Sequence, residues 1–151
     1  MNQNYILILA VLGMFILTSC TPNTSQGKIE MPMNEEGNFI LYVSDQSREI
    51  SPVDIRIYID GKLAIDDNFD VTGNRTPQHN WKKFQFQLEK GNHTIKATSQ
   101  KGDTILEKNF EIIDKHWAVI DYWYYSKVSG GAGPEPKHFI FNIQDKPIGF
   151  K

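Results

Sequence analysis

A period of two in the apolar residues constrains this chain more than any other feature. From Asn38 onward, apolar side chains alternate with polar ones along a series of short runs. Successive side chains of a strand point to opposite faces, so this period indicates strands. No stretch of about 11 residues has a helical period after the first 20 residues. The alternating positions are Phe39, Leu41, Val43; Val53, Ile55, Ile57, Ile59; Phe84, Phe86, Leu88; His93, Ile95, Ala97; Leu106, Phe110, Ile112; and Phe139, Phe141, Ile143.

Turn residues separate these runs at regular intervals. Asp60-Gly61 is a strong hairpin signal, Lys90-Gly91-Asn92 and Lys101-Gly102-Asp103 are further turns, and residues 130–136 form a loop rich in glycine and proline. About seven or eight short strands with such turns predict an all-β fold. We expect an antiparallel β-sandwich of the immunoglobulin or fibronectin type, with a small barrel as the alternative.

The amino-terminal segment indicates an export signal. Residues 6–17 form an apolar run of 12 residues, and no charged residue precedes Lys28. A membrane-spanning helix needs about 20 apolar residues, so this run suits the hydrophobic region of a secretory signal better. The sequence Leu17-Thr18-Ser19-Cys20 follows directly. It resembles the lipobox of bacterial lipoprotein signal peptides, although the usual basic residues before the apolar run are missing.

This resemblance implies lipid attachment at Cys20, cleavage before Cys20 and anchoring to an inner or outer membrane of the bacterial cell envelope. An ordinary secretory signal that happens to contain a cysteine is the alternative. We expect a signal peptide at 1–19, a lipidated flexible tether at 20–37 and a β-sandwich domain at 38–151. Alternation of Ile29, Met31 and Met33 suggests that the end of the tether pairs with a sheet edge.

A second resemblance concerns the middle of the chain. Residues 57–62 and 88–97 are similar to PEGA-type surface β-domains of bacterial envelope proteins, in which one strand ends in Asp-Gly and a later hairpin carries Gly-x-His. The matching motifs mostly encode turns, and residues 67–81 are an insertion relative to that pattern. The resemblance implies a β-domain in the envelope and assigns no catalytic residue.

Composition narrows the classes of function. A net charge of −2 gives no electrostatic basis for nucleic-acid binding. The single cysteine excludes an intrachain disulfide and a Cys-rich zinc site. The four histidines have no metal-ligand spacing. Asp66-Asp67-Asn68-Phe69-Asp70 resembles half of a calcium loop, but Val71 and Pro77 stand where glycine and glutamate belong, so we expect an acidic solvated turn. We expect neither a metal nor a cofactor.

Residues 116–125 hold the candidate binding residues. On a strand, Trp117, Val119, Asp121, Trp123 and Tyr125 share one face, and the residues between them share the other. Aromatic residues occur in both rows, so the row of Trp117, Asp121, Trp123 and Tyr125 is either core or a surface that binds a glycan or a protein. A buried aspartate needs a partner, which favours exposure of this row.

These features predict a membrane-anchored, non-catalytic binding or assembly module with an envelope protein or glycan as its partner. The chain has no nucleophile elbow and no phosphate-binding loop. The alternative is a small envelope hydrolase that uses Asp121 and the loop 126–137. It requires a histidine within hydrogen-bond reach of Asp121.

Overall fold

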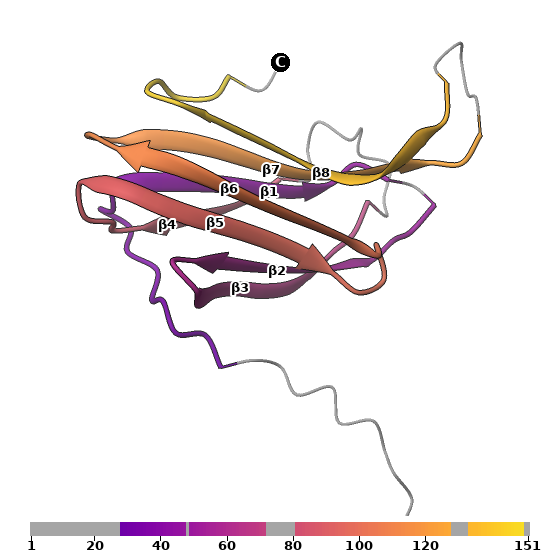
Figure 1. Cartoon of the computed structure of the whole chain (residues 1–151), viewed down its shortest axis with the longest axis horizontal. Helices are drawn as coiled ribbons and strands as arrows, with labels where there is room; N and C mark the ends of the chain where they lie inside the picture. Colours follow the sequence, from indigo (N-terminus) through magenta and orange to yellow (C-terminus); the bar gives the residue numbers. More distant parts are fainter. Residues whose placement is uncertain (1–27, 48, 72–80, 128–132, 150–151) are drawn as a thin grey trace, which may run out of the picture.

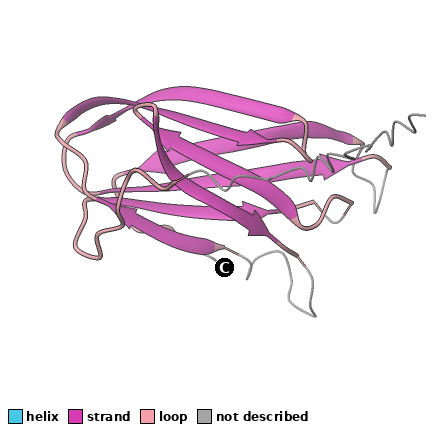
Figure 2. Ribbon diagram, turned by 90° about the horizontal axis from the view of Figure 1, so that it is seen from below, coloured by secondary structure: helices cyan, strands magenta, loops and turns pink. Residues whose placement is uncertain are grey.

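The computed structural model describes residues 28–47, 49–71, 81–127 and 133–149 and contains eight strands and no helix within these ranges. Two four-stranded sheets form a β-sandwich, which confirms the predicted all-β sandwich architecture (Figures 1 and 2). Sheet A has the order β4-β1-β7-β8, and sheet B has the order β3-β2-β5-β6. The strands are β1 (Phe39–Asp45), β2 (Val53–Ile59), β3 (Lys62–Phe69), β4 (Lys82–Phe86), β5 (Gly91–Ser99), β6 (Thr104–Ile112), β7 (His116–Tyr125) and β8 (Glu135–Gln144).

The core lies between the inner faces of the two sheets. In β2, every second residue is fully buried and the residues between them are only partly covered. Such alternation is typical of a strand with one face on the core and the other toward solvent. The rings of Phe39 and Phe110 stack across the core with centroids 5.1 Å apart, and Tyr122 meets Phe139 edge-on at 5.7 Å. The apolar residues that alternate in the sequence of β2 are therefore the ones that lie in the core.

One pair of strands departs from the expected antiparallel arrangement. In the middle of sheet A, β1 pairs with β7 in parallel, from Phe39 opposite His116 to Asp45 opposite Tyr122. Parallel neighbours require a long crossover connection. Here the connection includes all of sheet B and strand β4, which separate β1 from β7 in the sequence. Sequence periodicity is the same for both pairings, so it does not reveal this parallel pair.

The hairpin between β2 and β3 is confirmed. Asp60 and Gly61 have φ values of 51° and 76°. Positive φ at both central residues is the requirement of a type I′ turn, whose twist matches that of the flanking strands. A β-bulge interrupts the β2–β3 register between Ile57 and Tyr58. The Asp-Gly signal therefore predicted the correct turn type.

Three predicted turns and loops are partly wrong, one of them because Gly91 and Asn92 lie on β5. Asp66, Asp67 and Asn68 lie on β3 and do not form an acidic turn. Arg56 pairs with Asp66 at 3.2 Å and Lys82 pairs with Asp67 at 2.6 Å, so basic neighbours compensate the acidic side chains. Glu135 and Pro136 belong to β8 rather than to the loop before it. A proline is tolerated there because β8 is an edge strand.

The end of the expected tether, residues 20–37, docks on the domain. Glu30 N and Met31 N donate to the carbonyl oxygen of Leu63 on β3 at 2.8 and 3.2 Å. Asn34 N donates to the carbonyl oxygen of Gln85 on β4 at 2.8 Å. Because β3 and β4 are edge strands of different sheets, residues 30–37 connect the two edges; we call this segment the strap. Met31 also packs against the core.

Candidate functional site

The two rows of β7 have opposite roles. Ala118, Ile120 and Tyr122 are fully buried and belong to the core. In the alternate row, Trp117, Asp121, Trp123 and Tyr125 are partly exposed, whereas Val119 is buried. The row that the sequence singled out therefore lies on the face of sheet A that points away from sheet B.

Asp121 is the centre of a hydrogen-bond network on this face. Ser44 Oγ donates to Asp121 Oδ1 at 2.6 Å, and Trp81 Nε1 donates to the same oxygen at 2.8 Å. Gln46 Nε2 donates in turn to Ser44 Oγ at 2.7 Å. Ser44 and Asp121 are register partners on the parallel strands β1 and β7, so the sheet itself brings them together. Burial raises the pKa of Asp121, and the two hydrogen bonds oppose this rise.

One aromatic side chain, Trp81, contacts this carboxylate, and three others lie on the same row of β7. We call Trp81, Trp117, Asp121, Trp123 and Tyr125 the outer aromatic face. The rings of Trp123 and Tyr125 are tilted against each other with centroids 5.9 Å apart, and Tyr125 Oη donates to the carbonyl oxygen of Gln46 at 2.6 Å. Lys115 Nζ lies 5.9 Å from the ring centroid of Trp117. Within the described chain, the buried Trp123 Nε1 has no hydrogen-bond partner. Aromatic anchors held in this way are preorganised for contact with a ligand.

The sequence identified only part of this face. Trp117, Asp121, Trp123 and Tyr125 share a face because a strand places alternate residues together. Trp81 and Ser44 were missed, since they come from segments 40 and 77 residues away from Asp121. Parity along β1 does place Ser44 on the same side as Tyr42, but nothing in the sequence shows that β1 lies next to β7.

The histidines are engaged elsewhere. The ring of His93 contacts Asp60 and the carbonyl oxygen of Glu89, His116 contacts the carbonyl oxygen of Asp114, and His138 contacts Glu135 and the carbonyl oxygen of Pro136. His79 and Cys20 lie outside the described residues. None of the described histidines contacts Asp121. No group of three or more His, Cys, Asp or Glu within the described ranges could hold a metal ion.

Comparison with family models and with curated proteins finds no match to this chain. Among the residues with described structure, no helix is long and apolar enough to cross a membrane.

Proposed function

We propose that this protein is a lipid-anchored envelope lipoprotein that acts as a non-catalytic binding or assembly module. The observation that carries the binding role is the outer aromatic face: partly exposed rings share one face with a hydrogen-bonded carboxylate on β7, an interior strand of sheet A. Rigid aromatic side chains contribute large contact areas at a small entropic cost, which suits them to bind an envelope protein or a glycan. The lipobox-like sequence Leu17-Thr18-Ser19-Cys20 supports the lipid anchor.

The contacts of Asp121 favour binding over hydrolysis. A hydrolase using Asp121 and the loop 126–137 needs a histidine that exchanges a proton with this carboxylate or with substrate. The described partners of Asp121 are a hydroxyl and an indole, both of which donate to one oxygen. Such donors hold a carboxylate in place, and no observation on this face favours a catalytic role.

The lipid anchor is tested by mass spectrometry of the mature protein. Wild type is expected to begin at an acylated Cys20, because the lipobox-like sequence implies lipid transfer to this thiol before cleavage. Cys20→Ala is expected to accumulate as uncleaved precursor. An unmodified thiol at Cys20 in the mature protein would contradict the anchor.

The outer aromatic face is tested by site-specific photocrosslinking in intact cells. A photoreactive phenylalanine analogue at Trp117 is expected to capture an envelope protein or polysaccharide, and the mass and chemistry of the adduct distinguish the two. Ile113 is the matched control, because it is 59% exposed and lies in the turn between β6 and β7. Equal adducts at both positions, or none at Trp117, would contradict a contact role for this face.

A further inference from the structure

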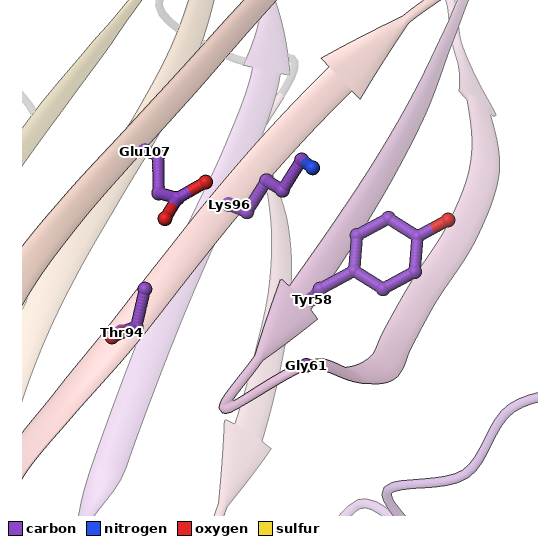
Figure 3. Close-up of a pocket in the computed structure, with 5 residues that line it drawn as sticks. All are labelled: Tyr58, Gly61, Thr94, Lys96 and Glu107. Carbon is purple, nitrogen blue, oxygen red and sulfur yellow. The ribbon is translucent and has the colours of Figure 1, made fainter.

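A separate hollow of ≈ 380 Å³ lies on the outer face of sheet B. It is therefore on the opposite side of the sandwich from the outer aromatic face. Tyr58, Gly61, Thr94, Lys96 and Glu107 line it (Figure 3). Its volume is within the range of about 300–1,000 Å³ that small-molecule sites occupy.

Three strands place the functional groups of this hollow in one row. Tyr58 on β2 is the register partner of Lys96 on β5, and Lys96 is the register partner of Glu107 on β6. All three side chains therefore start from paired strands rather than from loops, which fixes their positions.

The lysine and the glutamate of the hollow are not joined in an ion pair, unlike another pair of charges on this face. Arg56 and Asp66, also on the outer face of sheet B, form an ion pair at 3.2 Å. By contrast, in the described part of the chain Lys96 and Glu107 form no ion pair with each other or with a third residue. Figure 3 shows the Lys96 side chain extending toward the Tyr58 side of its strand, away from the carboxylate of Glu107. One cationic donor and one anionic acceptor therefore remain available beside an aromatic ring.

The remaining lining residues, Gly61 and Thr94, contribute free space and a hydrogen-bond acceptor. A Cβ atom added at Gly61 would have no atom within 4 Å, so the turn leaves free space next to Tyr58. Thr94 Oγ1 donates to Asn109 Oδ1 at 3.1 Å. Its lone pairs can still accept a hydrogen bond, because a hydroxyl has two acceptor sites.

We propose that this hollow binds a hexopyranose unit of a neutral glycan. The electron-rich face of the Tyr58 ring packs against the C–H groups of the sugar ring. Adjacent sugar hydroxyls donate to Glu107 and accept from Lys96, which satisfies both charges without a charged ligand. The ligand is neutral because the lysine and the glutamate of the hollow cancel. This inference goes beyond the proposed function, since it concerns the other sheet and does not depend on the lipid anchor.

The test is an NMR titration of the purified full-length protein with maltotriose and with chitotriose, two neutral hexopyranose trimers. At least one sugar is expected to shift the amide signals of Tyr58, Lys96 and Glu107 to saturation, with a Kd of about 1 mM, as befits a shallow site. Tyr58→Ala and Glu107→Gln are each expected to weaken this binding about tenfold or more, a loss of about 1.4 kcal/mol. Glu111→Gln, at an exposed glutamate of β6 outside the lining of the hollow, is the matched control for Glu107→Gln and is expected to bind as wild type does. Unchanged amide spectra away from the substituted residue confirm that each variant is folded.

The outcomes separate this inference from the proposed function. Absence of shifts at the hollow with both sugars at about 20 mM, well above the expected Kd, would overturn the glycan site and leave the outer aromatic face untouched. Shifts confined to Trp117, Asp121 and Trp123 would also overturn it, and they would support a glycan on sheet A. Saturating shifts at the hollow that Glu111→Gln preserves and that Tyr58→Ala and Glu107→Gln weaken would establish the site independently of sheet A.

Discussion

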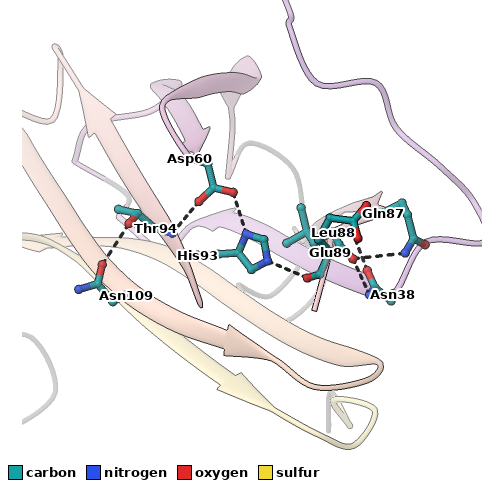
Figure 4. A network of polar contacts seen from close by, with 8 residues as sticks. All are labelled: Asn38, Asp60, Gln87, Leu88, Glu89, His93, Thr94 and Asn109. Carbon is teal, nitrogen blue, oxygen red and sulfur yellow. Dashed lines mark hydrogen bonds and ion pairs between the residues drawn. The ribbon is translucent and has the colours of Figure 1, made fainter. Parts of the chain in front are cut away.

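Asp60 and His93 join two turns at one end of sheet B. His93 Nδ1 lies 2.7 Å from Asp60 Oδ2, and Asp60 Oδ1 accepts a hydrogen bond from Thr94 N at 2.9 Å (Figure 4). The other ring nitrogen, His93 Nε2, lies 2.8 Å from the carbonyl oxygen of Glu89. Both ring nitrogens therefore face acceptors, an arrangement that only the protonated imidazolium satisfies with two donors. The His93 side chain is only 10% exposed and packs near Phe110.

This pair predicts a pH dependence of stability. Burial opposes the charged form of His93, but the hydrogen bonds to Asp60 and to the Glu89 carbonyl outweigh it and raise the pKa of His93. Its contribution to the free energy of unfolding is therefore complete below about pH 6.5, the ordinary histidine value, and is lost as pH rises through the raised pKa. Chemical denaturation from pH 5.5 to 8.5 is expected to show that His93→Gln loses less stability, relative to wild type, as pH increases.

Asn109→Ala is the control for this prediction. It removes a non-titrating member of the same network, the acceptor of Thr94 Oγ1, so its effect is expected to be constant with pH. A constant difference between His93→Gln and wild type across the same range would contradict the assignment.

Asp60 acts at lower pH. Its pKa is lowered, because the hydrogen bonds from His93 and Thr94 outweigh burial. The contribution of Asp60 to the free energy of unfolding is therefore lost only as pH falls below the ordinary aspartate pKa.

Ionisation of a second carboxylate, Asp45, is expected to destabilise the fold, whereas protonation of His93 stabilises it. Asp45 is 1% exposed, its Oδ1 accepts a hydrogen bond from Ser47 N at 2.8 Å, and its buried Oδ2 has no partner in the described chain. Burial raises the pKa of Asp45 to about 7, and the charge of Asp70 adds to this rise. Between about pH 4 and 7 the folded state binds more protons than the unfolded state, so stability falls as pH rises.

Asp45→Asn is therefore expected to be more stable than wild type at pH 8 by about 1–3 kcal/mol. At pH 5 its free energy of unfolding is expected to equal that of wild type or to be lower. The amide oxygen can still accept from Ser47 N, and no charge is buried. Midpoints of urea unfolding at the two pH values provide the measurement. Destabilisation of equal size at both values would show that the ionised form carries no penalty in the fold.

The sequence predicted strands best where one face is buried. In β2, four buried apolar residues alternate with Asp54, Arg56 and Tyr58, and the following Asp-Gly pair permits only a turn with positive φ. Strand β3 was partly missed, since Asp66 and Asp67 read as solvated loop residues. Arg56 and Lys82, which compensate them, come from 10 and 15 residues away in the sequence. Local pattern contains no information about such partners.

The same limit applies to the outer aromatic face. The alternation of β7 fixes which residues lie together, but aromatic residues occur in both rows, so the pattern does not identify the core row. Tyr122 is buried because its row faces sheet B, a consequence of the pairing of β7 with β1 and β8. Trp81 joins Asp121 only through tertiary contact. Sequence pattern alone therefore does not predict contacts that depend on the order of the strands in the sheet.

Gly61→Val is expected to destabilise the fold by about 1–3 kcal/mol. A valine at this position has free space, so the cost arises from the positive φ of 76°, which a β-branched residue adopts only under strain. Gly133→Val is the control, because that position also has free space and has no positive φ. Thermal melts of both variants provide the test. Equal melting temperatures for Gly61→Val and Gly133→Val would contradict the type I′ turn.

Gly37→Ala is expected to weaken the docking of the strap. A Cβ atom at this position would lie 2.2 Å from the carbonyl oxygen of Phe86, a backbone atom of β4 that cannot move freely. Overpacking of this kind costs about 1–3 kcal/mol. Hydrogen exchange is expected to show faster exchange of the amides of Glu30, Met31 and Asn34, which bond to the edge strands. Unchanged exchange at these three amides would show that the strap does not depend on the close approach at Gly37.

The last prediction separates the outer aromatic face from the core. Trp123 is partly exposed, and its buried Nε1 has no partner in the described residues, so Trp123→Ala is expected to cost about 1–2 kcal/mol, less than the 3–5 kcal/mol typical of a buried aromatic residue. Phe39→Ala, at a fully buried position, is the matched comparison and is expected to show the full cost. Trp123→Phe keeps an aromatic ring next to Tyr125, removes the unpaired donor and is expected to be close to neutral. Urea unfolding of the three variants gives the free energies. A loss above about 3 kcal/mol for Trp123→Ala would place this row in the core energetically and remove the basis for a binding surface on sheet A.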